Sequence, residues 1–151
     1  VRCAWVESPQ GRIIKTFATL AVQKRLKGEP PDELTLQFLG GELDGESMHV
    51  AGMPHFVVGQ VEIVFVAGNG VRFCPLIGMM HGRYRVRTDE VSGREYVARD
   101  DEAPLESEHD VQLPHGGAGS KRAFRKPSLT FSPEDFERKI AAEIDRRAKL
   151  H

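Results

Sequence analysis

Cysteine is scarce in this sequence, with only Cys3 and Cys74 among 151 residues. Two thiols exclude a disulfide-dense scaffold and a zinc site built from four thiolates. Both lie in apolar, strand-like contexts, VRCAWV and VRFCPLI, and neighbouring strands bring Cα atoms within the roughly 4.4–6.8 Å that a disulfide requires. Two alternatives therefore stay open: a Cys3–Cys74 disulfide, or two buried thiols that pack as small hydrophobic side chains.

Long apolar runs and an excess of either charge are also missing. No stretch approaches the roughly 20 apolar residues of a membrane-spanning helix, so we expect no membrane insertion. The formal net charge of −1 provides no field that would concentrate polyanions, so nucleic acid is not the expected partner. The first ten residues lack the regions of a signal peptide, yet the chain begins on an apolar run, which leaves the compartment open.

Turn residues and short alternating apolar runs fill the first hundred residues and predict β structure. The segment 12–26 fits both a strand and a helix, and its β-branched residues favour the strand. Asp44 and Gly45 predict a tight hairpin with a returning arm at 48–50, and the glycines around Asn69 predict a second hairpin. The remaining strands are expected at 1–6, 34–38, 61–66, 71–77, 83–88 and 95–98. This pattern predicts an all-β barrel or sandwich over residues 1–99.

A polar segment and a helix are expected to follow. Residues 100–126 are acidic and then glycine-rich, which predicts a flexible linker because such a composition buries little apolar surface. Ser132 and Pro133 then form a helix start within the C-terminal segment 127–151. Phe136, Ile140 and Ile144 recur every four residues as an apolar stripe. The stripe either docks on its own chain or covers a protein partner or a second subunit.

No catalytic or metal-binding motif is evident. The six histidines lack the i, i+4 spacing with glutamate that a zinc hydrolase uses. His49, His55 and His81 lie in expected loops, where they would either converge on a metal or remain ordinary surface side chains. Ser47 precedes His49 by two residues, without the elbow or oxyanion donors of a serine hydrolase.

Three arginines alternate along one expected strand. Arg83, Arg85 and Arg87 would point to the same face, and some β-barrels bind single-stranded nucleic acid on such a face. Tyr84 would point to the opposite face, so no aromatic platform accompanies the arginines. The alternative is a solvated face on which the arginines form ion pairs with neighbouring strands.

The order of these features resembles an uncharacterised bacterial β-domain family, many members of which are extracytoplasmic. The matching pieces are GRIIKT (11–16), LKG (26–28), 33–36, Gly40–Gly41, GMPHFVVGQVEIVFV (52–66) and GRYRV (82–86). The LKG step is also similar to the oligonucleotide-binding-like (OB-like) barrel of netrin-type modules, whose cysteine framework is absent here. The resemblance implies a small Greek-key barrel and export.

The sequence thus predicts an all-β, OB-like Greek-key barrel with a C-terminal amphipathic α-helix. We expect a non-enzymatic binding or interaction module without a cofactor, slightly favoured outside the cytoplasm. The alternatives are a metal-dependent or hydrolytic enzyme that uses the loop histidines, and a single-stranded nucleic-acid binder that uses the arginines.

Overall fold

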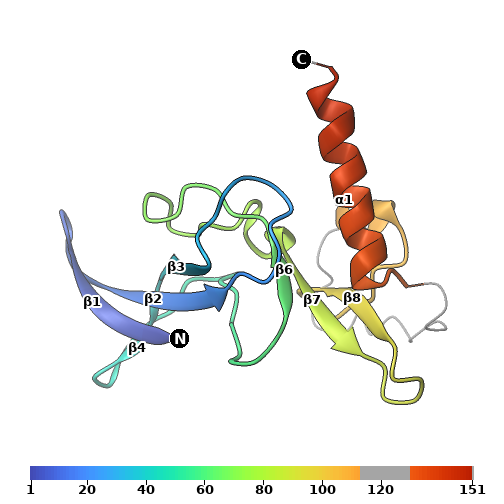
Figure 1. The fold of residues 1–151 in the computed structure, drawn as a ribbon. Helices are drawn as coiled ribbons and strands as arrows, with labels where there is room; N and C mark the ends of the chain where they lie inside the picture. Colours follow the sequence, from blue (N-terminus) through green and yellow to red (C-terminus); the bar gives the residue numbers. More distant parts are fainter. Residues whose placement is uncertain (113–129, 151) are drawn as a thin grey trace. The chain divides into compact units, whose positions relative to one another are not determined.

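A computed structural model describes residues 1–112 and 130–150 (Figure 1). These residues form three antiparallel sheets, and one α-helix follows them at the C-terminal end. No closed barrel is found in the described part of the chain, so the expected fold holds at the level of mostly β structure with a C-terminal helix. Most of the expected linker, 113–126, and the first residues of the expected helical segment, 127–129, lie outside the described residues.

The chain divides into two compact units. Unit 1 comprises residues 1–24, 29–60 and 64–82, and unit 2 comprises residues 25–28, 61–63 and the described residues from 83 onward. The boundary falls inside residues 1–99, for which the sequence predicts one barrel.

Unit 1 is built on the sheet β1-β2-β3, formed by β1 (Arg2–Ser8), β2 (Gly11–Ala21) and β3 (Glu33–Leu39). The prediction of a strand rather than a helix after Gly11 is confirmed. A two-residue turn joins β1 to β2, with Ser8 opposite Gly11. One face of the sheet is apolar, because residues two apart on β2 and β3 point the same way. The buried side chains of this face are Ile14, Ala18, Leu36 and Phe38.

The core of unit 1 continues from this face into the later loops. Leu36 and Phe38 cluster with Cys74 and Leu76, and Phe56 packs against Phe38 with ring centroids 5.3 Å apart. The cluster contains no charged side chain among the described residues, so hydrophobic burial is its main source of stability.

A short hairpin, β4 (Gly41–Leu43) and β5 (Glu46–Met48), packs against β1 and β2. Its turn confirms the hairpin predicted from Asp44 and Gly45, whose φ angles are +54° and +79°. Two positive φ angles are what a tight turn of this hand requires. The returning arm is Glu46–Met48 rather than the predicted 48–50.

The prediction of a second hairpin around Asn69 is wrong for its returning strand, 71–77. Ala67 N donates to Pro75 O and Ile77 N to Phe65 O, but between them lies only one isolated bridge. Residues 71 to 74 turn instead of extending, since Val71 N and Arg72 N both donate to Gly68 O. Pro75 lacks an N–H group for a ladder.

The loop covers the outer edge of β3. The Asn69 side chain accepts from Gln37 N at 3.0 Å and donates to Thr35 O at 2.8 Å, and Leu39 N donates to Phe73 O. These bonds take the place of a fourth strand. The alternation of apolar residues from Val71 to Ile77 therefore reflects a covering loop rather than a strand.

The β structure of unit 2 comes from the sheet β6-β7-β8. Its strands are β6 (Glu62–Val64), β7 (Arg83–Thr88) and β8 (Glu95–Arg99). A 3₁₀ turn at Glu108–Gln112 follows β8, and another at Met79–Gly82, in unit 1, precedes β7. After β8 the chain stays folded, because Arg99 N donates to Ala103 O and Leu105, which is fully buried, donates to Val97 O. The first residues of the predicted linker thus carry part of this core.

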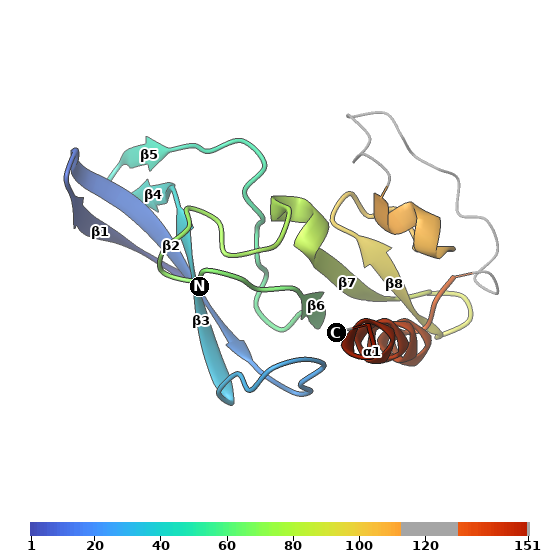
Figure 2. The ribbon, with the colours of Figure 1, turned by 90° about the horizontal axis from the view of Figure 1, so that it is seen from above.

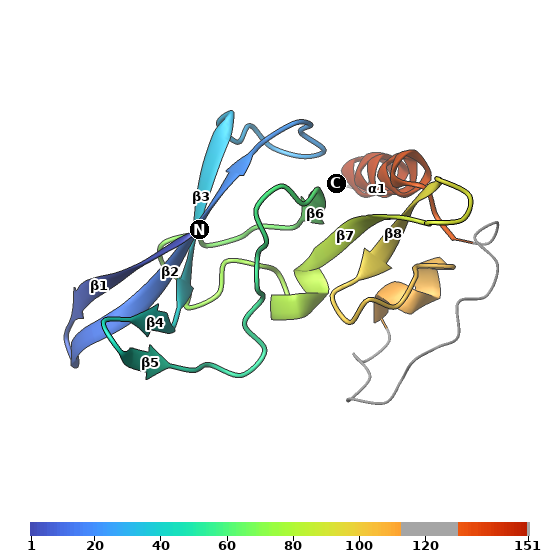
Figure 3. The same ribbon diagram turned by 90° about the horizontal axis from the view of Figure 1, so that it is seen from below.

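The α-helix α1 (Pro133–Ala148) begins as predicted, with the Ser132 hydroxyl accepting from Asp135 N at 3.1 Å. It lies beside the β7-β8 hairpin, which Figure 2 and Figure 3 show from opposite sides. Phe136 is buried against Tyr84, with ring centroids 4.9 Å apart. The first turn of the helix therefore docks on its own chain, against β7. This is one of the two alternatives predicted for the apolar stripe.

Candidate functional site

The three candidate histidines are exposed and lie on different loops. His49 follows β5, His55 follows Pro54, and His81 lies in the 3₁₀ turn before β7. No group of three or more histidine, cysteine or acidic side chains is arranged to hold a metal ion among the described residues. The metal hypothesis therefore gains no support from geometry here.

Both cysteines of unit 1 are free thiols. The Cys3 Sγ atom lies 3.5 Å from the Thr16 hydroxyl, and Cys74 belongs to the apolar core. Burial raises the pKa of the Cys74 thiol above its ordinary value, which lowers the fraction of reactive thiolate. Cys74 thus packs as a hydrophobic side chain in this structure.

The three arginines of β7 lie on one face, as predicted, but each one already binds a carboxylate. Arg83 is 1% exposed and donates two hydrogen bonds to Glu62, at 2.8 and 2.6 Å. Its third bond, at 3.0 Å, goes to Asp100. The two outer arginines continue the series, since Arg85 binds Asp100 and Glu102 and Arg87 binds Glu102 twice. We call this alternating series the arginine ladder; it consists of Glu62, Arg83, Asp100, Arg85, Glu102 and Arg87.

The arginine ladder contains three positive and three negative groups, so their formal charges cancel. The Arg87 hydrogen bonds hold the pKa of Glu102 below its ordinary value, and the same bonds raise the pKa of Arg87. Burial raises the pKa of Tyr84, on the opposite face of β7. All three guanidinium groups are therefore engaged in ion pairs within unit 2.

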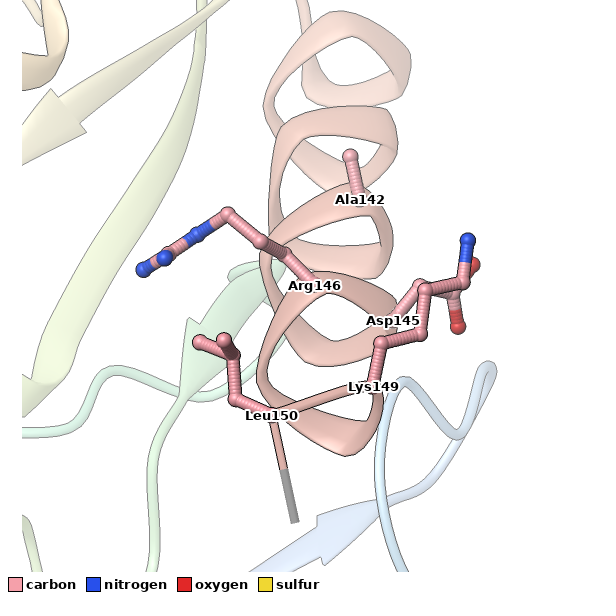
Figure 4. Close-up of a pocket in the computed structure, with 5 residues that line it drawn as sticks. All are labelled: Ala142, Asp145, Arg146, Lys149 and Leu150. Atoms are coloured by element: carbon pink, nitrogen blue, oxygen red, sulfur yellow. The ribbon is translucent and has the colours of Figure 1, made fainter.

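The apolar stripe on α1 is covered only at its beginning. Phe136 is buried, Ile140 and Ile144 are half-buried, and the residues after Ile144 are exposed. A shallow hollow near the end of the helix is lined by exposed side chains of α1 and the two residues after it alone (Figure 4). Because no other element supplies a wall, this hollow is not a ligand site.

A second hollow, in unit 1, lies over the loop that covers β3. It has a volume of about 590 Å³ and opens widely to solvent. Val71 and Phe73 line it with exposed fractions of 90% and 53%, and Ile77, beside it in sequence, is 51% exposed. We call this surface the apolar loop site; its lining residues are Val71, Arg72, Phe73, Cys74, Leu76, Gly78 and Met79.

The apolar loop site is held by the scaffold beneath it. Four hydrogen bonds fix the loop at three residues: two from the Asn69 side chain to β3, one from Leu39 N to Phe73 O, and one from Ile77 N to Phe65 O. Cys74 and Leu76 anchor it in the core, with at most 4% exposure. Its exposed side chains are thus carried on a loop that is hydrogen-bonded to β3 and to Phe65.

Sequence reasoning missed this site. The alternation of Val71, Phe73 and Ile77 with other residues is also the pattern of a half-buried strand, and a sequence does not report exposure. The nearest available signal was the run of turn residues at Gly68, Asn69 and Gly70, which marks a loop as well as a hairpin.

No helix in the described ranges combines the length and apolar character needed to span a membrane. Comparison with known proteins gives no further guide to function: no family model, no curated protein and no solved structure matches this chain.

Proposed function

We propose that this protein is a non-enzymatic interaction module that binds a polypeptide segment at the apolar loop site. The observation that carries the proposal is the exposure of Val71 and Phe73 on a fixed loop. Soluble proteins rarely leave large apolar side chains clustered in water, and such clusters commonly mark sites of protein interaction. Aromatic side chains in particular supply much of the affinity at interfaces.

The shape of the site favours a polypeptide over a small molecule. Small-molecule sites enclose most of their ligand's surface, whereas this hollow opens widely to solvent. An extended segment needs only one covered side, and it places alternate side chains against the surface. Apolar side chains at every second position would then contact Val71 and Phe73.

Charge adds a second requirement on the partner. Arg72 lies between Val71 and Phe73 in the lining, and no ion pair to it is found among the described residues. Its aliphatic stem lies close against Gly68, where an added Cβ atom would be 2.9 Å from Cγ. The stem is thereby positioned and the guanidinium is available to a carboxylate. We therefore expect the bound segment to carry an acidic residue beside its apolar ones.

The test is a selection of peptides from a random displayed library on the intact chain. Enriched peptides are expected to combine apolar and acidic residues, and to lose at least about tenfold in affinity for the Val71→Ser/Phe73→Ser variant, because burial of such side chains contributes about 1.5–3 kcal/mol each. Arg72→Glu should shift the enriched sequences from acidic to basic residues.

Val91→Ser is the matched control, since Val91 is 95% exposed but lies in the β7-β8 turn of unit 2. This variant should bind the selected peptides as wild type does. Peptides that bind the Val71→Ser/Phe73→Ser variant with undiminished affinity, or a selection that enriches none, would overturn the proposal.

A further inference from the structure

Asn69 is the only asparagine in the sequence, and its side chain attaches the loop that covers β3 to the backbone of that strand. The amide oxygen accepts from Gln37 N at 3.0 Å, and the amide nitrogen donates to Thr35 O at 2.8 Å. A backbone N–H group only donates and a backbone C=O group only accepts. The attachment therefore needs a side chain that offers a donor and an acceptor together. Asparagine does so, whereas aspartate, which has the same size, offers acceptors alone.

The residue that follows makes this amide chemically labile. In an Asn-Gly step the backbone nitrogen of the glycine can attack the side-chain amide carbon, because glycine has no Cβ atom that hinders the approach. Gly70 is exposed, and no hydrogen bond from its N–H group is found among the described residues. A Cβ atom added to it would meet only the Gln37 side chain, at 3.7 Å. The attacking nitrogen is thus unpartnered and open to solvent.

The reaction that this step undergoes is deamidation, and its only co-reactant is water. A bond forms between Gly70 N and Asn69 Cγ while the bond from Cγ to Nδ2 breaks. The proton of Gly70 N leaves with Nδ2 as ammonia, and a cyclic succinimide remains. Water then opens the ring at either of its carbonyl groups. One opening gives aspartate, and the other gives isoaspartate, in which the main chain continues through the former side chain.

Either product loses the attachment to β3. In the aspartate, an anionic oxygen would face Thr35 O, which is itself an acceptor, where the amide nitrogen of Asn69 now donates. A buried or partly buried acceptor that loses its donor is costly. The isoaspartate carries its carboxylate one carbon closer to the main chain, so that it no longer spans the distance to both Gln37 N and Thr35 O.

We propose that Asn69 is a modification site, at which deamidation detaches the outer part of the loop, residues 68–72, from β3. The two hydrogen bonds hold the amide toward β3, so the attack requires a brief release of the side chain. The detachment is one-way, because water converts the amide to an acid and does not restore it. Val71 belongs to the detached part, so the modification alters the apolar loop site. The inference holds whatever that site binds, since its readouts are the mass of the chain and the exchange of its amides.

Ageing of the intact chain in mildly alkaline buffer tests the site. Peptide mapping by mass spectrometry should show conversion of Asn69 in the folded chain, at a lower rate than in the chain unfolded by urea. Amide hydrogen exchange, followed by NMR, then compares fresh with aged protein. The amides of Gln37 and Leu39 donate to the loop. They should exchange about tenfold faster after conversion, as expected for the loss of one hydrogen bond that leaves its partner unsatisfied.

The amides of Leu36 and Phe38 are the internal control. They alternate with the two amides that donate to the loop, so they face β2, and their exchange should not change. Asn69→Asp should show the faster exchange at Gln37 and Leu39 without ageing. Gly70→Ala hinders the attack, so fresh and aged samples of this variant should keep the amide and exchange alike.

Three results would overturn the proposal. The first is a folded chain that keeps Asn69 under conditions that convert the unfolded chain. The second is unchanged exchange at Gln37 and Leu39 in the aged protein or in Asn69→Asp. The third is equal acceleration at Leu36 and Phe38, because the whole sheet, and not the loop alone, would then have loosened.

Discussion

The two units of this chain are stabilised by different means. The core of unit 1 is made of Ala18, Leu36, Phe38, Cys74 and Leu76, none of which carries a charge. In unit 2 the buried set includes Arg83, Arg99 and Asp110 beside Val97 and Leu105. The first core depends on the area that it removes from water. The second also depends on each buried charge keeping its partner.

The difference has a structural origin. The unit 1 sheet is long, and its inner face fills with aliphatic and aromatic side chains. In unit 2 the strands are short, with six residues in β7 and five in β8. Paired arginines there bring β6, β7 and the turn after β8 together, as Arg83 does by binding both Glu62 and Asp100. In this small sheet, which has little apolar surface to bury, ion pairs between specific side chains hold the strands together.

The largest effect is expected from Arg83→Met. Removal of the guanidinium leaves Glu62, whose side chain is 5% exposed, as a buried unpaired carboxylate. Loss of one partner from a buried pair costs roughly 3–5 kcal/mol. Chemical denaturation should show this loss in the free energy of unfolding, and amide hydrogen exchange should accelerate in β7 and β8 before β2 and β3.

The double variant Glu62→Leu/Arg83→Met is the control for this interpretation. Apolar replacement of both partners should recover much of the stability that the single change loses. If the double variant is less stable than Arg83→Met, the contribution of Arg83 lies in packing rather than in pairing, and the contrast between the units weakens.

A smaller effect is expected from Leu36→Ala in unit 1. Leu36 is fully buried, and a cavity in such a site costs about 3 kcal/mol. The loss in the free energy of unfolding should depend on the volume removed. Leu36→Ile, which keeps the volume, should therefore cost less than about 1.5 kcal/mol. Denaturation curves of the two variants measure this difference. Equal destabilisation by both would show that shape, and not buried area, limits the core of unit 1.

Local chemistry made several elements of both units predictable. Branched residues identified β2, Asp44–Gly45 identified the first hairpin, and Ser132–Pro133 identified the start of α1. Each of these rules involves residues within a few positions of one another. The resemblance to a bacterial β-domain family and the expected export stay predictions, as do the enzymatic and nucleic-acid alternatives.

Long-range pairing made the rest unpredictable. Alternation correctly placed Arg83, Arg85 and Arg87 on one face, but their partners include Glu62 and Asp100, 21 and 17 positions from Arg83. Asp100 and Glu102 belong to an acidic run whose composition indicates a linker, and their ion pairs with the arginines attach this run to β7. The exposure of Val71 and Phe73 was also unpredictable, because the same alternating pattern describes a half-buried strand and an exposed loop.

The smallest expected effect concerns the exposed end of the arginine ladder. The Glu102 side chain is 51% exposed, and its hydrogen bonds with Arg87 lower its pKa in the folded state. A carboxyl group with a lowered folded-state pKa stabilises the protein above its unfolded-state pKa, and this contribution disappears as the pH falls through the folded-state value. Wild type should therefore lose more stability than Glu102→Gln as the pH drops below about 5, by less than about 1 kcal/mol because solvent screens the pair. Urea denaturation of both proteins at a series of pH values measures the difference. Parallel pH profiles would mean that Glu102 contributes nothing that depends on its charge, which would confine the role of ion pairing in unit 2 to the buried Arg83 end of the ladder.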